Sequence, residues 1–121
     1  MSKKICVLED NDDIRELIGF ILEEEKFDVV SFSTVSEFNS KAKDIGADVF
    51  LLDVMLPDGN GLEVCQDLKS QEKTKNVPVL IMTANSKMDE VSGQCDAEDF
   101  ISKPFDINDL VKRVNLQVNK Q

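Results

Sequence analysis

Residues 49–61 read VFLLDVMLPDGNG, an apolar run that ends at Asp53 and gives way to a turn-rich segment. Two similar runs, ICVL at 5–8 and VLIM at 79–82, are also closed at once by a polar residue. Continuous rather than alternating apolarity predicts strands that are buried on both faces, as in parallel sheets. Residues 27–32 and the short pair 100–101 give weaker signals, so the pattern predicts five strands.

Helical patterns lie between these runs. Residues 14–22 carry one apolar stripe on a charged segment, which predicts an amphipathic helix. Thr34 and Glu37 have capping-box spacing and predict a second helix, whose end fits Gly46. A third helix is expected to open after Gly61, and a clear last helix to run from near Asp106 to residue 118. Residues 84–97 indicate only a short or irregular fourth helix.

The alternation of strand and helix, five times over with short connections, predicts right-handed βαβ units. The expected fold is therefore a doubly wound α/β sandwich with a parallel sheet. A chain of 121 residues with 41% hydrophobic content is long enough for one sizeable core and short for two. We therefore expect a single domain over residues 1–121.

The chain is strongly acidic, with 24 acidic and 14 basic residues and a formal charge of −10. This charge repels phosphate backbones and anionic lipids, so direct nucleic-acid and membrane binding are not expected. Surplus surface carboxylates also simply keep small proteins soluble. The chain has no histidine, which removes the commonest general base and any phosphohistidine role. Carboxylates, hydroxyls or lysines must then carry the chemistry.

The three cysteines have neither metal-binding nor CxxC spacing. Cys6 lies in an apolar run and Cys65 on an apolar helical stripe, so both are expected in the core, while Cys95 is given no role. This usage favours a reducing compartment. The first apolar run is far too short for a signal peptide or a membrane span, so the expected location is the cytoplasm.

Polar residues follow the apolar runs at the points where the predicted strands end. Ligands bind at the carboxyl ends of strands in open parallel sheets, so these residues are candidates for a site. If the first and third strands are neighbours, about 4.8 Å apart, the carboxylates of Asp10 and Asp53 come within reach of one ion. The complete set is Glu9, Asp10, Asp53, Thr83 and Lys103.

Clustered carboxylates repel one another, so either one takes up a proton or a cation neutralises them. Oxygen ligands without histidine or cysteine favour Mg²⁺, a metal typical of phosphate chemistry. Lys103 and Thr83 are consistent with phosphate chemistry, because an ammonium group and a hydroxyl both bind phosphoryl oxygens. Taken singly, Asp10 is better explained as a helix cap and a lone lysine as a solvated residue. Only the joint placement favours a functional site.

At this point the chain resembles the receiver domain of two-component response regulators, over about residues 4–118. The similarity rests on LEDN at 8–11, DVMLPDGNG at 53–61, MTA at 82–84 and KPF at 103–105. It implies a flavodoxin-like fold with strand order 2-1-3-4-5. It also implies a cytoplasmic phosphorelay protein rather than an enzyme, a monomer or weak dimer that acts on a downstream protein target.

The resemblance also assigns roles. Asp53 would be the nucleophile that takes a phosphoryl group from a sensor histidine kinase or phosphotransfer protein. Asp10, Asp53 and the backbone carbonyl of Met55 would ligate Mg²⁺, and Glu9 would act through a metal-bound water. Lys103 would pair with the phosphoryl group, with a cis bond to Pro104. Thr83 and Phe100 would be the switch residues that reshape the surface after phosphorylation.

Several positions depart from the family pattern. Asp96 stands where glycine is usual in the family, and the segment of residues 83–100 is about two residues shorter than the family pattern. Asn60 replaces a common acid, and its simplest interpretation is a turn residue that tolerates positive φ. Asn85 and Met55 occupy positions that tune phosphoryl lifetime. The output surface and the lifetime are therefore left open, as is whether the chain is complete or part of a longer regulator.

Two other classes of protein remain as alternatives. A haloacid-dehalogenase-like phosphatase also uses a strand-end aspartate with Mg²⁺, but its general acid would stand at Met55, which cannot donate a proton. The second class is a flavodoxin-like binding module or pseudo-receiver, in which the fold serves interaction alone and Asp53 is never modified. A flavodoxin-like module for FMN would need a Ser-, Thr- or Gly-rich phosphate loop where this chain has residues 9–13.

Overall fold

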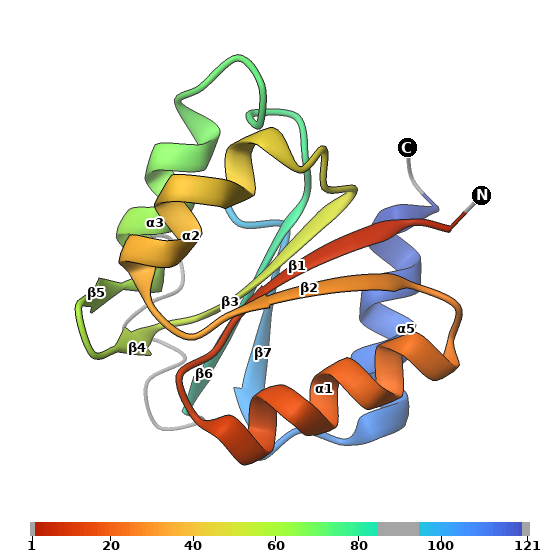
Figure 1. Ribbon diagram of the computed structural model, residues 1–121. Helices are drawn as coiled ribbons and strands as arrows, with labels where there is room; N and C mark the ends of the chain where they lie inside the picture. The colour runs from red at the N-terminus through yellow and green to blue at the C-terminus, as the bar shows by residue number, and fades with distance from the viewer. Residues whose placement is uncertain (1, 85–94, 120–121) are drawn as a thin grey trace.

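The computed structural model describes residues 2–84 and 95–119 (Figure 1). Five parallel strands form the central sheet in the order β2-β1-β3-β6-β7, which is the order 2-1-3-4-5 that the resemblance implies. These strands are β1 (Lys4–Leu8), β2 (Asp28–Phe32), β3 (Val49–Asp53), β6 (Val79–Ala84) and β7 (Asp99–Lys103). The predicted doubly wound α/β fold is therefore confirmed.

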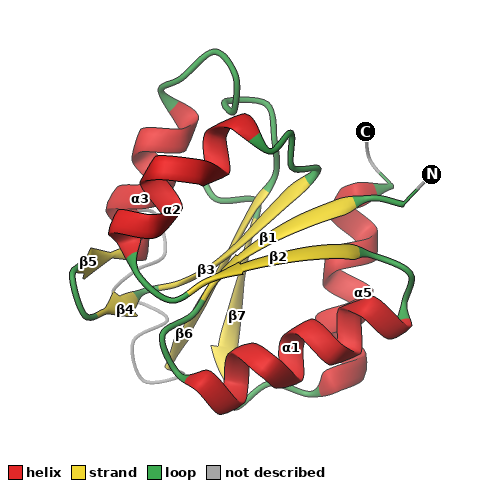
Figure 2. Cartoon of the chain, in the orientation of Figure 1, coloured by secondary structure: helices red, strands yellow, loops and turns green. Residues whose placement is uncertain are grey.

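Helices cover both faces of the sheet, and Figure 2 shows the three layers. On one face lie α1 (Asp12–Glu24) and α5 (Ile107–Val118), and on the other lie α2 (Val35–Lys41), its 3-10 extension η1 (Ala42–Asp44) and α3 (Gly61–Lys69) (Figure 1). Each face has its own apolar cluster, and β3 supplies Phe50 to one and Leu51 to the other. Alternate side chains of β3 thus enter opposite clusters, which explains its continuous apolar run.

The three strong apolar runs all become strands, and every residue of β3 is buried. The last strand is longer than the apolar pair 100–101 predicts, because it runs to Lys103 and makes that residue its final member. The structure also contains an antiparallel pair that was not predicted, β4 (Met55–Leu56) with β5 (Gly59–Asn60). Two-residue strands leave too short a pattern to be recognised.

Capping residues set where the helices begin, and at two positions they differ from the prediction. Asn11, not Asp10, caps α1, since its side chain accepts a hydrogen bond from the Ile14 amide at 3.0 Å. Asn60 has φ −139° rather than a positive φ, and its side chain caps α3 by accepting from the Leu62 amide at 2.7 Å. These amide side chains satisfy orphan donors that open each helix.

Other predicted boundaries are confirmed. Thr34 caps α2 by accepting a hydrogen bond from the Glu37 amide at 3.1 Å, and Asp106 caps α5. Gly46 has φ +77° just after η1, in the left-handed region that ends helices. The predicted fourth helix falls mainly on residues 85–94, and it lies outside the described residues together with Asn85.

Candidate functional site

The carboxyl edge of the sheet brings together residues that are far apart in sequence. β1 and β3 pair in register, with Leu8 opposite Leu52, so the residues that follow them, Glu9 and Asp53, lie at the same level. β7 ends at the same edge and contributes Lys103. The predicted neighbour relation between the first and third strands is thus confirmed, and it assembles the site.

Three carboxylates form the acidic part of the site. Glu9, Asp10 and Asp53 each offer an oxygen, and these oxygens all lie within 4.8 Å of one another. Glu9 is 1% exposed and Asp53 7% exposed, while Asp10 lies at the surface. Solvent therefore reaches Asp10, while the other two members of the set are largely desolvated.

Lys103 lies between the two buried carboxylates. Its Nζ atom is 2.6 Å from Glu9 Oε1 and 3.2 Å from Asp53 Oδ1. Burial opposes the charge of this amine, but the hydrogen bond to Glu9 and the two negative charges hold its pKa above the ordinary value. The position of Lys103 at this edge was predicted, but its pairing with Glu9, a contact that spans 94 residues of sequence, was not.

The electrostatic balance of the site disfavours a charged Asp53. Burial and then repulsion by Glu9 raise its pKa from 3.8 to about 6, against the opposing charge of Lys103. One amine faces three carboxylates, which leaves an excess of two negative charges. A divalent cation matches this excess, and an all-oxygen donor set is the kind that Mg²⁺ prefers. The residues present therefore fit a magnesium ion.

The loop after Asp53 is held close to it. Met55 begins β4, so its backbone carbonyl lies two residues beyond Asp53 in the same loop. A Cβ atom on Gly61 would overlap the backbone carbonyl oxygen of Asp53, so only glycine fits there. The carboxylate of Asp58 accepts hydrogen bonds from the Val35 amide at 2.8 Å and the Ser36 amide at 3.0 Å, which ties the loop to α2.

The two predicted switch residues lie on adjacent strands. Thr83 is 2% exposed, next to the end of β6, and pairs in register with Ser102 of β7. Phe100 is half-buried and packs against the apolar cluster under α2 and α3. A salt bridge that was not predicted from the sequence attaches β7 to α5. In this pair, Arg113 Nη1 lies 2.8 Å from Asp99 Oδ1.

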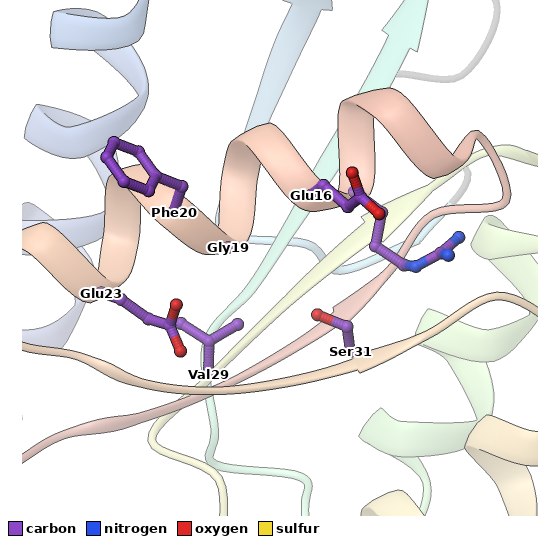
Figure 3. Close-up of a pocket in the computed structure, with 7 residues that line it drawn as sticks. Glu16, Gly19, Phe20, Glu23, Val29 and Ser31 are labelled. Carbon is purple, nitrogen blue, oxygen red and sulfur yellow. The ribbon is translucent and has the colours of Figure 1, made fainter.

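A separate groove lies between α1 and β2. Its volume is about 330 Å³, and Figure 3 shows Glu16, Phe20 and Glu23 on α1 beside Val29 and Ser31 on β2. Among the described residues that line it, none belongs to the predicted site. None of the helices in the described ranges has the length and apolar character needed to cross a membrane.

Comparison with known proteins agrees with this fold. The family model described as response regulator receiver domain matches residues 5–115. The Escherichia coli phosphate regulon transcriptional regulatory protein PhoB is 35% identical over 116 residues, which cover 94% of this chain and 51% of that protein. The Bacillus subtilis alkaline phosphatase synthesis transcriptional regulatory protein PhoP is 37% identical, over 94% of this chain and 48% of its own length.

Solved structures give the same fold. The receiver domain of the sensor histidine kinase PA1611 from Pseudomonas aeruginosa, with magnesium in its active-site cleft, has a TM-score of 0.90 at 23% identity. The structural match covers 98% of this chain and 99% of the PA1611 receiver domain. Fold and site define a doubly wound α/β protein with a cluster of carboxylates, paired with a lysine, at the carboxyl edge of its sheet.

The chain belongs to the response regulator receiver domain family of two-component signalling. Members of this family are signalling domains rather than classical enzymes. The chain spans about half the length of the curated relatives it matches.

Proposed function

We propose that this chain is a phosphoacceptor receiver, in which Asp53 takes a phosphoryl group in a Mg²⁺-dependent reaction and a protein-binding surface changes as a result. The observation that carries the proposal is the convergence of Glu9, Asp10 and Asp53 around one point, with Lys103 paired to two of them. We also propose that residues 1–121 form a single receiver domain. The cytoplasmic location remains part of the proposal and is supported by family membership.

Each residue of the site has a distinct part in the proposed reaction. An Asp53 carboxylate oxygen attacks the phosphorus of a phosphohistidine on a partner histidine kinase or phosphotransfer protein. The phosphorus–nitrogen bond breaks as the new phosphorus–oxygen bond forms. Lys103 then pairs with an oxygen of the transferred group, and the Thr83 hydroxyl donates to another. A lysine already within 3.2 Å of Asp53 supports this role.

The metal ligands in the proposal are Asp10, Asp53 and the Met55 carbonyl, with Glu9 acting through a metal-bound water. When bound, Mg²⁺ would offset the negative charge of the acidic set and of the incoming phosphoryl oxygens. The raised pKa of Asp53 supports this role, because it indicates that the ionised carboxylate is disfavoured unless a positive charge lies beside it. The magnesium in the cleft of the PA1611 receiver domain is a parallel case.

The switch in the proposal consists of Thr83 and Phe100. Thr83 would move toward the phosphoryl group and Phe100 would turn inward, a population shift between two packings of one fold. The register of the two strands supports a coupling, because Phe100 lies opposite Ile81 and Ser102 opposite Thr83. The downstream target is a protein, since the acidic chain repels nucleic acid.

Intact-protein mass spectrometry after incubation with acetyl phosphate tests the proposal. We expect one added phosphoryl group on the wild type in the presence of Mg²⁺ and none when EDTA replaces the metal. Asp53→Asn should remain unmodified in both conditions, while Asp48→Asn, a carboxylate at the opposite end of β3, serves as the matched control and should be labelled. An unlabelled wild type with Mg²⁺ present would instead identify a pseudo-receiver.

A further inference from the structure

A pair of cysteines lies outside the acidic site. Cys65, on α3, is fully buried, and Cys95 is partly exposed in the segment that leads into β7. Both pack within the same apolar cluster. Their thiols lie within hydrogen-bonding reach, and burial followed by this hydrogen bond raises the pKa of the Cys65 thiol. The two sulfur atoms are therefore neighbours although 30 positions separate them in sequence.

An ion pair holds the same two segments together. Lys69, one helical turn beyond Cys65, places Nζ 2.9 Å from both carboxylate oxygens of Glu98, three residues beyond Cys95. Glu98 is itself fixed to β6, because its Oε1 accepts from the Val79 amide at 2.7 Å and its own amide donates to the Val79 carbonyl at 2.8 Å. Residues 95–98 are thus attached to α3 at two adjacent points.

We propose that Cys65 and Cys95 are a redox-modification site, which closes to an intramolecular disulfide when the chain meets a low-molecular-weight disulfide such as oxidised glutathione. The proposal does not depend on phosphoryl chemistry. Disulfides that form in a reducing compartment are usually transient and have a catalytic or redox-sensing role.

The reaction proceeds by two thiol–disulfide exchanges. Cys95 reacts first because it is the accessible thiol: its thiolate attacks one glutathione sulfur and releases a glutathione thiolate. The Cys65 sulfur then attacks the Cys95 sulfur, releases the second glutathione and passes its proton to a released thiolate. Two protein thiols lose two electrons in total, and one glutathione disulfide becomes two thiols. The fixed proximity of the pair favours the second exchange over a lasting mixed disulfide.

The disulfide would join α3 covalently to the segment that enters β7, the strand that carries Phe100 and Lys103. A cross-link between distant points restricts the unfolded chain. We therefore expect the oxidised chain to unfold at a higher urea concentration than the reduced chain.

Peptide mapping of the folded chain after incubation with oxidised glutathione tests the proposal. The intact mass should fall by two hydrogens, and a non-reducing digest should contain a peptide linking Cys65 to Cys95 that dithiothreitol removes. Cys6→Ala, which removes a buried cysteine on β1, is the matched control and should keep both signals. Cys95→Ala should lose them.

Three outcomes overturn the proposal: a stable glutathione adduct on Cys95 without a cross-linked peptide, a disulfide that involves Cys6, or full alkylation of Cys65 and Cys95 when the treated chain is unfolded. The wild-type map decides between these outcomes and the expected one, so the conclusion holds even where a variant folds poorly.

Discussion

Asp53 is a carboxylate placed where its charge is disfavoured. It is almost completely buried, it faces Glu9, and its pKa rises to about 6 as a result. Such a group binds either a proton or a cation more readily than an exposed aspartate does. In the metal-free site, the electrostatic destabilisation therefore falls mainly on Asp53, the residue that we propose as the phosphoacceptor.

This environment predicts a pH-dependent stability. The pKa of Asp53 in the folded chain is about 6, above the ordinary value of 3.8. The favourable contribution of Asp53 to the free energy of unfolding is therefore complete below about pH 4 and is lost as pH rises through 6. Asp53→Asn should raise the free energy of unfolding of the metal-free chain at pH 8 by about 3 kcal/mol, and by little at pH 4. Urea unfolding followed by circular dichroism in EDTA measures this, and a variant less stable than the wild type at pH 8 would contradict it.

Lys103 competes with a metal ion for the same carboxylates. Lys103→Met removes the amine 2.6 Å from Glu9 and should destabilise the metal-free chain, yet it should tighten Mg²⁺ binding by about tenfold because more negative charge remains. Isothermal titration with MgCl₂ measures the affinity. Lys73→Met, which removes an exposed amine paired with Asp44, is the matched control and should leave the affinity unchanged. Weaker binding in Lys103→Met would count against the assigned charge balance.

At the scale of elements, α3 starts unusually close to β3. The first residue of α3 is Gly61, and a Cβ atom there would overlap the Asp53 carbonyl oxygen, which belongs to backbone and cannot move aside easily. Gly61→Ala should therefore lower the free energy of unfolding by roughly 3 kcal/mol. Urea unfolding measures this, and an unchanged stability would contradict the close approach.

Gly19 provides the control for that substitution. It lies inside α1, and a Cβ atom there would meet nothing within 4 Å. Gly19→Ala should stabilise the chain by about 0.5–1 kcal/mol, because alanine loses less backbone entropy in a helix. The two alanine variants should thus change stability in opposite directions.

Much of the element order could be predicted from the sequence because its strands are buried on both faces. The runs at 5–8, 49–52 and 79–82 become strands within two residues of their expected ends. The length of the edge strand β7 was underestimated, because only Ile101 among its five residues is buried. The strand therefore has no continuous apolar run. Among strands long enough to leave a pattern, the degree of burial decides how clearly the sequence predicts them.

The site was predictable in position but not in its contacts. Strand ends placed Glu9, Asp53 and Lys103 at one edge, since parallel strands share a direction. The Lys103–Glu9 pairing depends on side-chain geometry across two non-adjacent strands, and no local pattern encodes it. The same limit applies to Asp58, which bonds amides of α2 across more than 20 residues.

For the whole molecule, metal binding and folding should be linked through the site. The chain carries a charge of −10, so any dication reduces general repulsion, but only a specific site gives a saturable effect. At a Mg²⁺ concentration about 100 times the dissociation constant, the wild type should gain about 2.7 kcal/mol. Thermal unfolding at matched ionic strength measures this gain, and an equal gain in Asp53→Asn would show that the effect is nonspecific.

We propose that the cluster of Glu9, Asp10 and Asp53 directs phosphorylation to Asp53 alone. Treatment of the acetyl phosphate product with sodium borohydride reduces an aspartyl phosphate to homoserine, and peptide sequencing by mass spectrometry then locates it. We predict homoserine at residue 53, formed only when Mg²⁺ accompanied the acetyl phosphate. Homoserine at another aspartate, or a borohydride-resistant label on a serine or threonine, would contradict the account.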